Sequence, residues 1–346
     1  MKNPMKSPVG YSKVKCMNHR ELIRVDSIKK HFDVASKIWF THKYVKAVDN
    51  ISFSIEEGET VSLVGESGCG KTTLGRLILR LIEPTSGSVF FMGEDLQQMD
   101  QEQMRKIRRN MQIIFQNPFA SLNPRKTVNQ ILRQPYRIHE NFGTGEALRQ
   151  KVFELMETVE LTPPSLYIDR YPHEFSGGQR QRIGIARAIA SKPKFIVADE
   201  PVSALDMSVR AQILNLMKDL QARFGMTYLF ITHDLSVVRS ISTRVIVMYL
   251  GELIEVAPVK AVFADPKHPY TKALLSATPI PNPRKARERH RIVLKGDVPS
   301  PIDPPSGCRF HTRCPECMPI CIEKAPPKVN LGSDEQIHEV NCWLYN

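Results

Sequence analysis

The sequence predicts an α/β protein with a largely parallel sheet, and two observations carry this prediction. The apolar run ETVSLV is followed by the glycine-rich stretch GESGCGKTT and then by LGRLILRLIE, so a strand, a loop and a helix follow one another. The apolar segments FIVADEP and TYLFITHD are separated by the helical pattern VRAQILNLMKDLQARFG. Strands that alternate with helices in this way form parallel sheets.

The bulk composition limits the class of protein. A chain of 346 residues with 42% hydrophobic content is long enough for two domains with a real core. The longest apolar runs, TYLFI and VIVMYL, are strand-sized and far from the roughly 18 residues that a membrane span needs. Residues 1–20 contain no apolar signal region, so we expect a mobile tail and a cytoplasmic protein. The net charge of +12 is compatible with binding to nucleic acid, with binding to an anionic membrane, or with a basic face that is only solvated. The charge alone does not distinguish these functions.

Short β-like patterns precede the glycine-rich stretch. The segments LIRVDSIKKHF and VKAVDNISFSI lie between residues 22 and 55, and the turn EEGE leads into the next strand. The helix predicted after the glycine-rich stretch has an apolar stripe made of Leu74, Leu77, Ile78, Leu81 and Ile82.

The middle and the end of the chain have different patterns. From about residue 95 to 171 the apolar spacing is helical, as in Leu148, Val152, Leu155, Met156 and Val159. From Pro258 onward prolines cluster in DPKHPY, TPIPNP and DVPSPIDPPSG. We therefore predict a helical subdomain, and after it a separate, irregular extension with little helix or sheet.

The stretch GESGCGKT matches the phosphate-binding pattern G-x-x-x-x-G-K-S/T in its required strand–loop–helix context. Glycines allow backbone N–H groups to point at phosphate oxygens, and the helix amino end favours the negative charge. Lys71 is expected to reach the β- and γ-phosphates and Thr72 to bind Mg²⁺, while Cys69 contributes only its backbone. The predicted ATP contacts in this stretch are Gly65, Ser67, Gly68, Cys69, Gly70, Lys71, Thr72 and Thr73.

Two acids end the apolar run of FIVADEP. Asp199 is expected to hold Mg²⁺ through water, and Glu200 to orient or deprotonate the attacking water. With the phosphate-binding loop present, an ordinary exposed strand end is the weaker explanation for this pair.

The segment FSGGQRQRIGIARAIA resembles the signature of the ATP-binding subunits of ATP-binding-cassette (ABC) transporters. FQNPFASLNPRKTV, HPYTKALLSATPIPNP and GCRFHTRCP resemble the oligopeptide/dipeptide importer branch of that family. The resemblance implies an ABC-type P-loop NTPase fold with an antiparallel β subdomain. It also implies domain boundaries: a tail at 1–20, an ATP-binding domain at 21–257 with a helical subdomain at about 95–180, and the C-terminal extension at 258–346.

The resemblance also implies roles for residues outside the phosphate loop. In this family two cassettes meet head to tail, and each signature closes on the ATP of its partner. Gln116 is expected to contact Mg²⁺ and the site of water attack, although a glutamine before Asn-Pro could also be a turn residue. His233 is expected to hydrogen-bond the γ-phosphate, and Asp206 to communicate across the dimer. The signature residues expected to act in trans are Ser176, Gly177, Gly178 and Gln179.

An aromatic side chain ahead of VKAVDNISF is expected to stack on adenine. Tyr44 is the preferred candidate over Trp39, Phe40 and His42.

Five of the seven cysteines lie near the C-terminus, in GCRFHTRCPECMPIC and HEVNCWL. Cys308, Cys314, Cys321 and Cys342 resemble the iron–sulfur-binding tail of the importer branch, and four thiolates are what a 4Fe–4S cluster requires. Cys317 departs from that pattern, and its C-x-x-C pair with Cys314 would also suit tetrahedral zinc. From the residues alone, a cluster, zinc and unmetallated thiols all remain open, with a structural role for any metal.

The resemblance predicts an ATPase subunit of a peptide importer on the cytoplasmic side of the membrane. Its expected partners are a second ABC ATPase, which we expect to be a paralogue, two transmembrane permease subunits and, indirectly, an extracytoplasmic substrate-binding protein. Import of oligosaccharides or another solute is an alternative. A nucleic-acid- or ribosome-associated cassette ATPase is a second one, but the single cassette and the lack of a long heptad insertion argue against it. We therefore expect no nucleic-acid partner.

Overall fold

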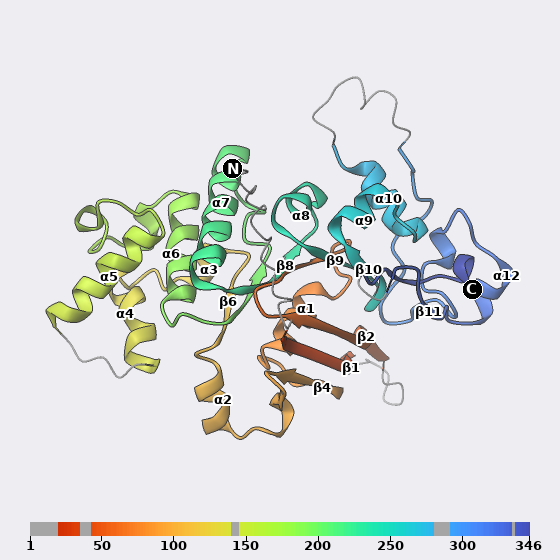
Figure 1. The fold of residues 1–346 in the computed structure, drawn as a ribbon, viewed down its shortest axis with the longest axis horizontal. Helices are drawn as coiled ribbons and strands as arrows, with labels where there is room; N and C mark the ends of the chain where they lie inside the picture. The colour runs from red at the N-terminus through yellow and green to blue at the C-terminus, as the bar shows by residue number, and fades with distance from the viewer. Residues whose placement is uncertain (1–19, 35–42, 140–144, 280–290, 334–335) are drawn as a thin grey trace, which may run out of the picture.

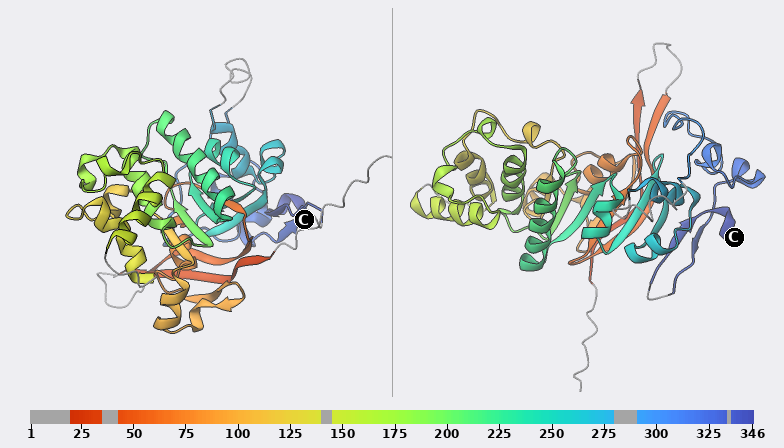
Figure 2. Two further views of the ribbon diagram at one scale, coloured as in Figure 1. Left: turned by 60° about the vertical axis from the view of Figure 1, so that its left-hand side comes forward. Right: turned by 90° about the horizontal axis from the view of Figure 1, so that it is seen from above.

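The computed structural model describes residues 20–34, 43–139, 145–279, 291–333 and 336–346. It contains two sheets, one with the strand order β2-β1-β4-β5 and one with the order β11-β12-β10-β9-β3-β8-β7-β6. Figure 1 shows the larger sheet at the centre, the smaller sheet below it, a group of helices on one side and the C-terminal extension on the other. Figure 2 shows from two further directions that the helices and the extension lie at opposite ends of the molecule.

The smaller sheet is antiparallel and is built from the N-terminal β-like segments. β1 (Glu21–Val34) pairs with β2 (Lys43–Glu56) and with β4 (Ser86–Phe91), and β4 pairs with β5 (Glu94–Asp95). Apolar residues of β1 such as Ile23 and Ile28 are fully buried in a core shared with the larger sheet. This arrangement confirms the antiparallel β subdomain expected from the sequence.

The centre of the larger sheet is parallel, as predicted. β3 (Thr60–Val64) lies between β8 (Thr227–Thr232) and β9 (Arg244–Tyr249), and β7 (Phe195–Asp199) lies between β8 and β6 (Met111–Ile114). β3, β7 and β8 are buried along their whole length, because helices or the smaller sheet cover both faces. The loops that follow parallel strands meet at one edge of a sheet, so those after β3, β6, β7 and β8 come together there.

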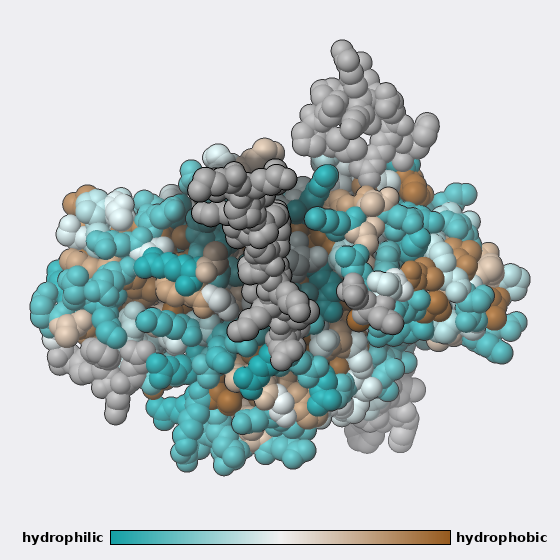
Figure 3. All heavy atoms as spheres, viewed as in Figure 1, coloured by the Kyte–Doolittle hydropathy of each residue, from teal (hydrophilic) through white to brown (hydrophobic). Residues whose placement is uncertain are grey.

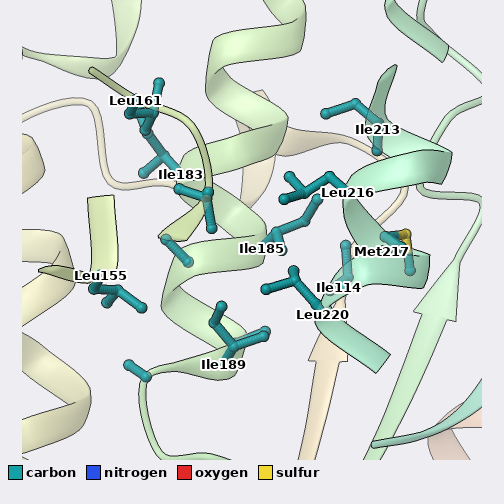
Figure 4. Close-up of a cluster of buried hydrophobic side chains, with 14 of the residues drawn as sticks. Ile114, Leu155, Leu161, Ile183, Ile185, Ile189, Ile213, Leu216, Met217 and Leu220 are labelled. Atoms are coloured by element: carbon teal, nitrogen blue, oxygen red, sulfur yellow. The ribbon is translucent and has the colours of Figure 1, made fainter. Parts of the chain in front are cut away.

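Helices pack on both sides of the parallel strands. A cluster of buried apolar residues joins β6 to two helices, with Ile185, Leu216 and Leu220 facing one another at its centre (Figure 4). The helices of the core are α1 (Lys71–Ile78), α2 (Gln101–Ile107), α3 (Pro118–Ser121), α4 (Val128–His139), α5 (Glu146–Thr158), α6 (Gly177–Ile189), α7 (Met207–Phe224) and α8 (Leu235–Ile241). The helical spacing predicted from Leu148 to Val159 corresponds to α5, whose apolar stripe is buried.

The helix after the glycine-rich stretch ends earlier than its apolar stripe predicts. α1 stops at Ile78, whereas the stripe continues to Leu81 and Ile82. Arg80 has a left-handed backbone with φ of 46°, and the N–H of Leu81 donates to the carbonyl of Arg76 at 2.8 Å. These are the features of a helix C-terminus closed by a left-handed residue. Leu81 is consequently 46% exposed rather than buried in the stripe.

The C-terminal extension contains more regular structure than the sequence predicts, and it joins the larger sheet. β12 (Glu339–Asn341) pairs with β11 (Lys328–Asn330) and with β10 (Glu252–Pro258), which itself pairs with β9. Because an edge strand leaves a row of backbone groups unpaired, β12 covers an edge that β10 would otherwise expose. Strands of three residues are too short for an alternation of apolar and polar residues to be detected in the sequence. The helices of the extension are α9 (Val259–Ala264), α10 (Pro269–Ala277) and α12 (Pro319–Glu323).

A buried carboxylate fastens the extension to β10. The Glu255 side chain accepts hydrogen bonds from the backbone N–H groups of Lys267 and His268, both at 2.9 Å, and from Nε2 of His338 at 2.8 Å. Glu255 is only 1% exposed. Burial alone would raise the pKa of Glu255, but these hydrogen bonds outweigh it and hold the pKa below its usual value of 4.5.

The stability of this junction should therefore depend on pH. A carboxyl group whose folded pKa is depressed contributes stability above its unfolded pKa and loses that contribution as the pH falls through the folded value. We expect Glu255→Gln to destabilise the protein by about 1–3 kcal/mol at pH 7 and by less at pH 4. Thermal unfolding at both pH values tests this, with exposed Glu323→Gln in α12 as the control. An equal loss at pH 4 and pH 7 would contradict the assignment of charge to Glu255.

Among the residues that the structure describes, no helix is both long enough and apolar enough to cross a membrane. The face seen in Figure 3 is mostly hydrophilic, with small hydrophobic patches scattered over it, some of them on the extension.

Candidate functional site

The glycine-rich stretch forms a loop between the end of β3 and the start of α1, as the sequence predicts. Lys71 is buried, and its Nζ donates to the carbonyl oxygens of Gly65 at 2.8 Å and Glu66 at 2.9 Å. The Cys69 sulfur lies 3.8 Å from the same nitrogen. An ammonium group has three N–H donors, so two hold the loop closed and the third can serve a phosphate oxygen in place of the weak sulfur contact.

Gly70 lies at the amino end of α1 in a backbone conformation with φ of 106°, which residues with a Cβ rarely adopt. A Cβ placed there would lie 2.0 Å from the carbonyl oxygen of Ala47 in β2. Among the residues that the structure describes, no side chain caps this end of α1. The first N–H groups of the helix can therefore bind an anion.

Gly70→Ala should weaken nucleotide binding at least tenfold and lower the free energy of unfolding by about 1–3 kcal/mol. The added methyl group would push the loop away from β2 and misplace the amide groups that face the phosphates. Equilibrium nucleotide binding and thermal unfolding measure the two effects. Gly93→Ala is the matched control, since Gly93 also has positive φ, 85°, but has open space around it. Equal effects of the two substitutions on nucleotide affinity would refute the steric argument.

The structure brings Thr72 and Asp199 together, as the magnesium prediction requires. Thr72 Oγ1 donates to Asp199 Oδ1 at 3.0 Å, across the space between the start of α1 and the end of β7. Burial raises the pKa of Asp199, and the hydrogen bond from Thr72 opposes that shift. A hydroxyl and a carboxylate oxygen at this spacing are the kinds of ligand that Mg²⁺ prefers.

Three of the predicted catalytic residues meet at the carboxyl edge of the parallel strands. Gln116 Nε2 donates to Glu200 Oε2 at 2.9 Å, and His233 Nδ1 lies 3.1 Å from Glu200 Oε1. The three side chains follow β6, β7 and β8. Glu200 is mostly buried, whereas His233 and Gln116 are exposed. A partly buried carboxylate that is held between an amide and an imidazole can accept a proton from water.

Glu200 also has an unusual backbone. Its φ is 46°, in the left-handed region, and its N–H donates to the carbonyl oxygen of Ile231 in the neighbouring strand at 3.0 Å. Its carbonyl oxygen accepts a hydrogen bond from Ser203 Oγ at 3.1 Å. Strained non-glycine backbone that is held by such bonds is concentrated at functional sites.

The signature residues form the amino end of α6. Ser176 caps the helix, because its Oγ accepts from the N–H of Gln179 at 3.3 Å and Gln179 Oε1 accepts from the N–H of Ser176 at 3.0 Å. Gly178 lets α6 approach α7, since a Cβ there would lie 2.4 Å from Val209 Cγ1. In the described part of the chain, no hydrogen bond or ion pair joins residues 176–179 to residues 65–73.

Asp206 has a structural function in the isolated chain. Its carboxylate caps α7 by accepting from the N–H of Val209 at 3.0 Å and from Ser208 Oγ at 2.7 Å. The backbone hydrogen bond from Val209, followed by that from Ser208, lowers the pKa of Asp206. Its predicted communication across a dimer stays a prediction.

The adenine-stacking candidate lies at the start of β2. Tyr44 is 46% exposed there. The alternatives Trp39, Phe40 and His42 lie outside the described residues, so the choice among the four stays a prediction.

The cysteine prediction is not confirmed as a metal centre. In the described ranges, no group of three or more histidine, cysteine, aspartate or glutamate side chains is arranged to hold a metal ion. Cys321 and Cys342 are buried, Cys308 and Cys314 are partly buried, and Cys317 is exposed. The thiols are nevertheless neighbours: burial, and then the nearby cysteines, raise the pKa of Cys308 to about 12 and that of Cys314 to about 11.

Sequence reasoning missed a set of contacts between the extension and the phosphate loop. Glu66, which occupies a variable position of the loop pattern, forms an ion pair with Arg313 and donates its backbone N–H to the Tyr270 hydroxyl. Arg313 and Glu66 are separated by 247 positions in the sequence. No local pattern could have linked them.

Comparisons with known proteins agree with this geometry. Residues 48–203 match the family described as ABC transporter, and residues 254–321 match the family described as oligopeptide/dipeptide transporter, C-terminal region. The chain is 52% identical to a putative oligopeptide transport ATP-binding protein, YkfD of Bacillus subtilis (strain 168), over 95% of this chain and 97% of that one. It is 51% identical to the oligopeptide transport ATP-binding protein AppF of the same organism, over 95% and 99%.

Solved structures are also similar. One is the dimeric ATP-binding cassette MJ0796 bound to ADP and Pi, with a TM-score of 0.61 and 31% identity over 69% of this chain and 99% of that one. Another is cbiO1 from Clostridium perfringens, with a TM-score of 0.60 and 26% identity over 71% of this chain and 92% of that one.

Proposed function

The chain belongs to the ATP-binding subunits of ABC transporters, and from that premise we propose that it hydrolyses ATP to power uptake of oligopeptides or dipeptides through separate membrane subunits. The observation that carries the proposal is the convergence of Gln116, Glu200 and His233 beside a complete phosphate loop. The substrate class is supported by the C-terminal region, which matches the oligopeptide/dipeptide transporter family.

In the proposed mechanism the loop amides and Lys71 hold the β- and γ-phosphates. Thr72, Asp199 and Gln116 would hold Mg²⁺, which offsets the negative charge that the phosphates carry. Two of these three groups already lie within hydrogen-bond distance of each other. Their oxygen-rich set of donors fits a magnesium ion.

Glu200 acts on the attacking water. The water oxygen forms a bond to the γ-phosphorus, its proton passes to the Glu200 carboxylate, and the bond between the γ-phosphorus and the bridging oxygen breaks to release ADP. Gln116 and His233 hold the carboxylate from either side in this structure. When ATP is bound, His233 would donate to the γ-phosphate, close to the same carboxylate.

The signature is proposed to act on a second nucleotide site. Ser176 is exposed at the amino end of α6, which suits an anion, and among the described residues no hydrogen bond or ion pair joins this end to the phosphate loop of the same chain. A second cassette, paralogous or identical, would place its ATP there. The similar cassette MJ0796 was solved as a dimer, which is consistent with such an arrangement.

The remaining partners follow from the family. We propose that two permease subunits bind this chain at the cytoplasmic face of the membrane, and that a substrate-binding protein delivers the peptide on the other side.

A 4Fe–4S cluster in the extension is part of the proposal. A zinc site needs four ligands that converge on one ion, whereas each iron of a cluster takes one thiolate, so the thiols can be farther apart. Cys321 and Cys342 are buried and Cys308 and Cys314 are partly buried, so these four thiols are the proposed ligands, and the exposed Cys317 is left outside the set. The cluster would pin the proline-rich extension.

Iron and acid-labile sulfide should be measured on anaerobically purified protein, with zinc counted in parallel. About four irons and four sulfides per chain, retained in Cys317→Ser and lost in Cys321→Ser, would support the cluster. One zinc per chain, or no metal, would refute it.

The transport function is tested by purifying the chain with its permease partners and reconstituting the complex in vesicles. ATP turnover should rise when peptides and the matching binding protein are supplied. If oligosaccharides but not peptides stimulate ATP turnover, the transported substrates are oligosaccharides and not peptides. Stimulation by DNA or ribosomes alone would refute the transporter function.

A further inference from the structure

Glu66 in the phosphate loop is held by the C-terminal extension at both its backbone and its side chain. Its N–H donates to the Tyr270 hydroxyl at 2.9 Å. Its carboxylate receives two hydrogen bonds from Arg313, with Nη1 to Oε2 at 2.8 Å and Nη2 to Oε1 at 3.3 Å. The Glu66 carbonyl oxygen is also one of the two acceptors that hold Lys71. One loop residue therefore joins the extension to the lysine predicted to bind phosphate.

The side chains that reach Glu66 are themselves rigidly packed. Tyr249 in β9, Tyr270 in α10 and Phe310 form a buried aromatic cluster with ring centroids 4.8–5.4 Å apart. Arg313 is 9% exposed, and its Nη1 also donates to the Tyr249 hydroxyl at 3.4 Å. Packed aromatic rings and a planar guanidinium keep a fixed geometry, so this contact can impose a position on the loop.

A second arginine of the same segment is connected to the phosphate loop through residues 250 and 251. Arg309 is buried, forms ion pairs with Asp49 and Glu252, and donates to the carbonyl oxygen of Leu250. The N–H of the following residue, Gly251, donates to the carbonyl oxygen of Cys69 at 3.0 Å. The extension thus supports the phosphate loop directly at Glu66 and indirectly at Cys69.

We propose that Arg313 and Tyr270 are positioning residues that hold the phosphate loop in its nucleotide-binding conformation, so that ATP affinity depends on the docking of the C-terminal extension. The inference rests on the proposed function, because it requires this loop to bind ATP.

Two physical effects support a dependence of ATP affinity on the docking of the extension. A glycine-rich loop loses much conformational freedom when it closes around phosphates, and a partner that orders it beforehand removes part of that loss. Glu66 also places a negative charge in a loop that must accept a triphosphate. Arg313 neutralises that charge, so its removal would leave a carboxylate that repels the ligand.

Coupling of this kind is reciprocal. If docking of the extension raises the affinity for ATP, bound ATP must stabilise the docked extension by the same factor.

The test measures the dissociation constant of a non-hydrolysable ATP analogue with Mg²⁺ by calorimetry on the full chain. Arg313→Gln should weaken binding about 5- to 20-fold and Tyr270→Phe about threefold, while Lys328→Gln should change nothing. Lys328 is the matched control, since its ion pair with Glu339 lies inside the extension, between β11 and β12. Adding Glu66→Gln to Arg313→Gln should recover at least threefold, because the unpaired charge is gone.

Hydrogen exchange of residues 305–323 provides the reciprocal measurement. The analogue should slow exchange there in the wild type and not in Arg313→Gln. Wild-type affinity of both folded Arg313→Gln and Tyr270→Phe would overturn the inference, as would exchange unaffected by the analogue. Tyr270→Phe keeps the packed ring, so it tests the contact even if Arg313→Gln misfolds.

Lys71→Ala separates this inference from the proposed function. If Lys71→Ala loses the analogue while Arg313→Gln binds as the wild type does, only the positioning of the loop by the extension fails. If Lys71→Ala binds normally, the proposed ATP site itself fails.

Discussion

Glu200→Gln should lower the rate of ATP hydrolysis by about 10²- to 10⁴-fold and leave ATP bound. Glutamine keeps the shape of the side chain and can still hydrogen-bond to its neighbours, but it cannot accept the proton of the attacking water. Because hydrolysis is what reopens the proposed dimer, the variant should accumulate as a closed, ATP-loaded dimer. Phosphate release, nucleotide content and size-exclusion chromatography measure the three effects.

The control for this variant is Glu102→Gln, which removes an exposed carboxylate paired with Lys106 on α2. It should hydrolyse ATP at the wild-type rate. Unimpaired turnover by Glu200→Gln would remove Glu200 from the proposed mechanism. If Glu200→Gln loses both ATP binding and ATP hydrolysis, Glu200 is needed for the structure of the site and not only for the chemical step.

Lys71→Ala should weaken ATP binding by roughly 100-fold or more, since two effects add. The variant loses a charge-assisted hydrogen bond to the phosphates, worth about 1.5–3 kcal/mol. It also loses the bonds from Nζ to the carbonyl oxygens of Gly65 and Glu66 that hold the loop closed. ATP that stabilises the wild type against thermal unfolding should therefore give no shift in the variant.

Lys106→Ala is the matched control, because it removes an exposed lysine and keeps the phosphate loop intact. Its unfolding temperature should rise with ATP as that of the wild type does. An equal rise for Lys71→Ala would show that the phosphates are bound elsewhere.

The phosphate loop of the ATP-binding region is in contact with the C-terminal extension. Lys71 contacts Glu66, and Glu66 is held by Arg313 and Tyr270 of the extension. A family-typical extension that lies against the nucleotide site is well placed to influence it. The phosphate loop lies in the region that matches the ABC transporter family, and the residues that contact Glu66 lie in the region that matches the oligopeptide/dipeptide transporter family.

Two sequence predictions are wrong, one for a local reason and one because of a long-range contact. The stripe from Leu74 to Ile82 predicts a longer helix, but Arg80 adopts a left-handed conformation that ends it. The extension was expected to be irregular, yet β12 joins the edge of the larger sheet at β10. The first outcome is local, since Arg80 and the hydrogen bond from Leu81 to Arg76 close the helix, whereas the second depends on a strand that is remote in the sequence.

Features that a few consecutive residues encode could be predicted from the amino-acid sequence. The phosphate loop between β3 and α1 and the acids at the end of β7 follow from spacing and residue type, since a few consecutive residues define each of them. Tertiary structure alone decided which of these groups meet. Gln116 and His233 reach Glu200 across 84 and 33 positions, and Arg313 reaches Glu66 across 247, because packing of the sheet and the extension closes those distances.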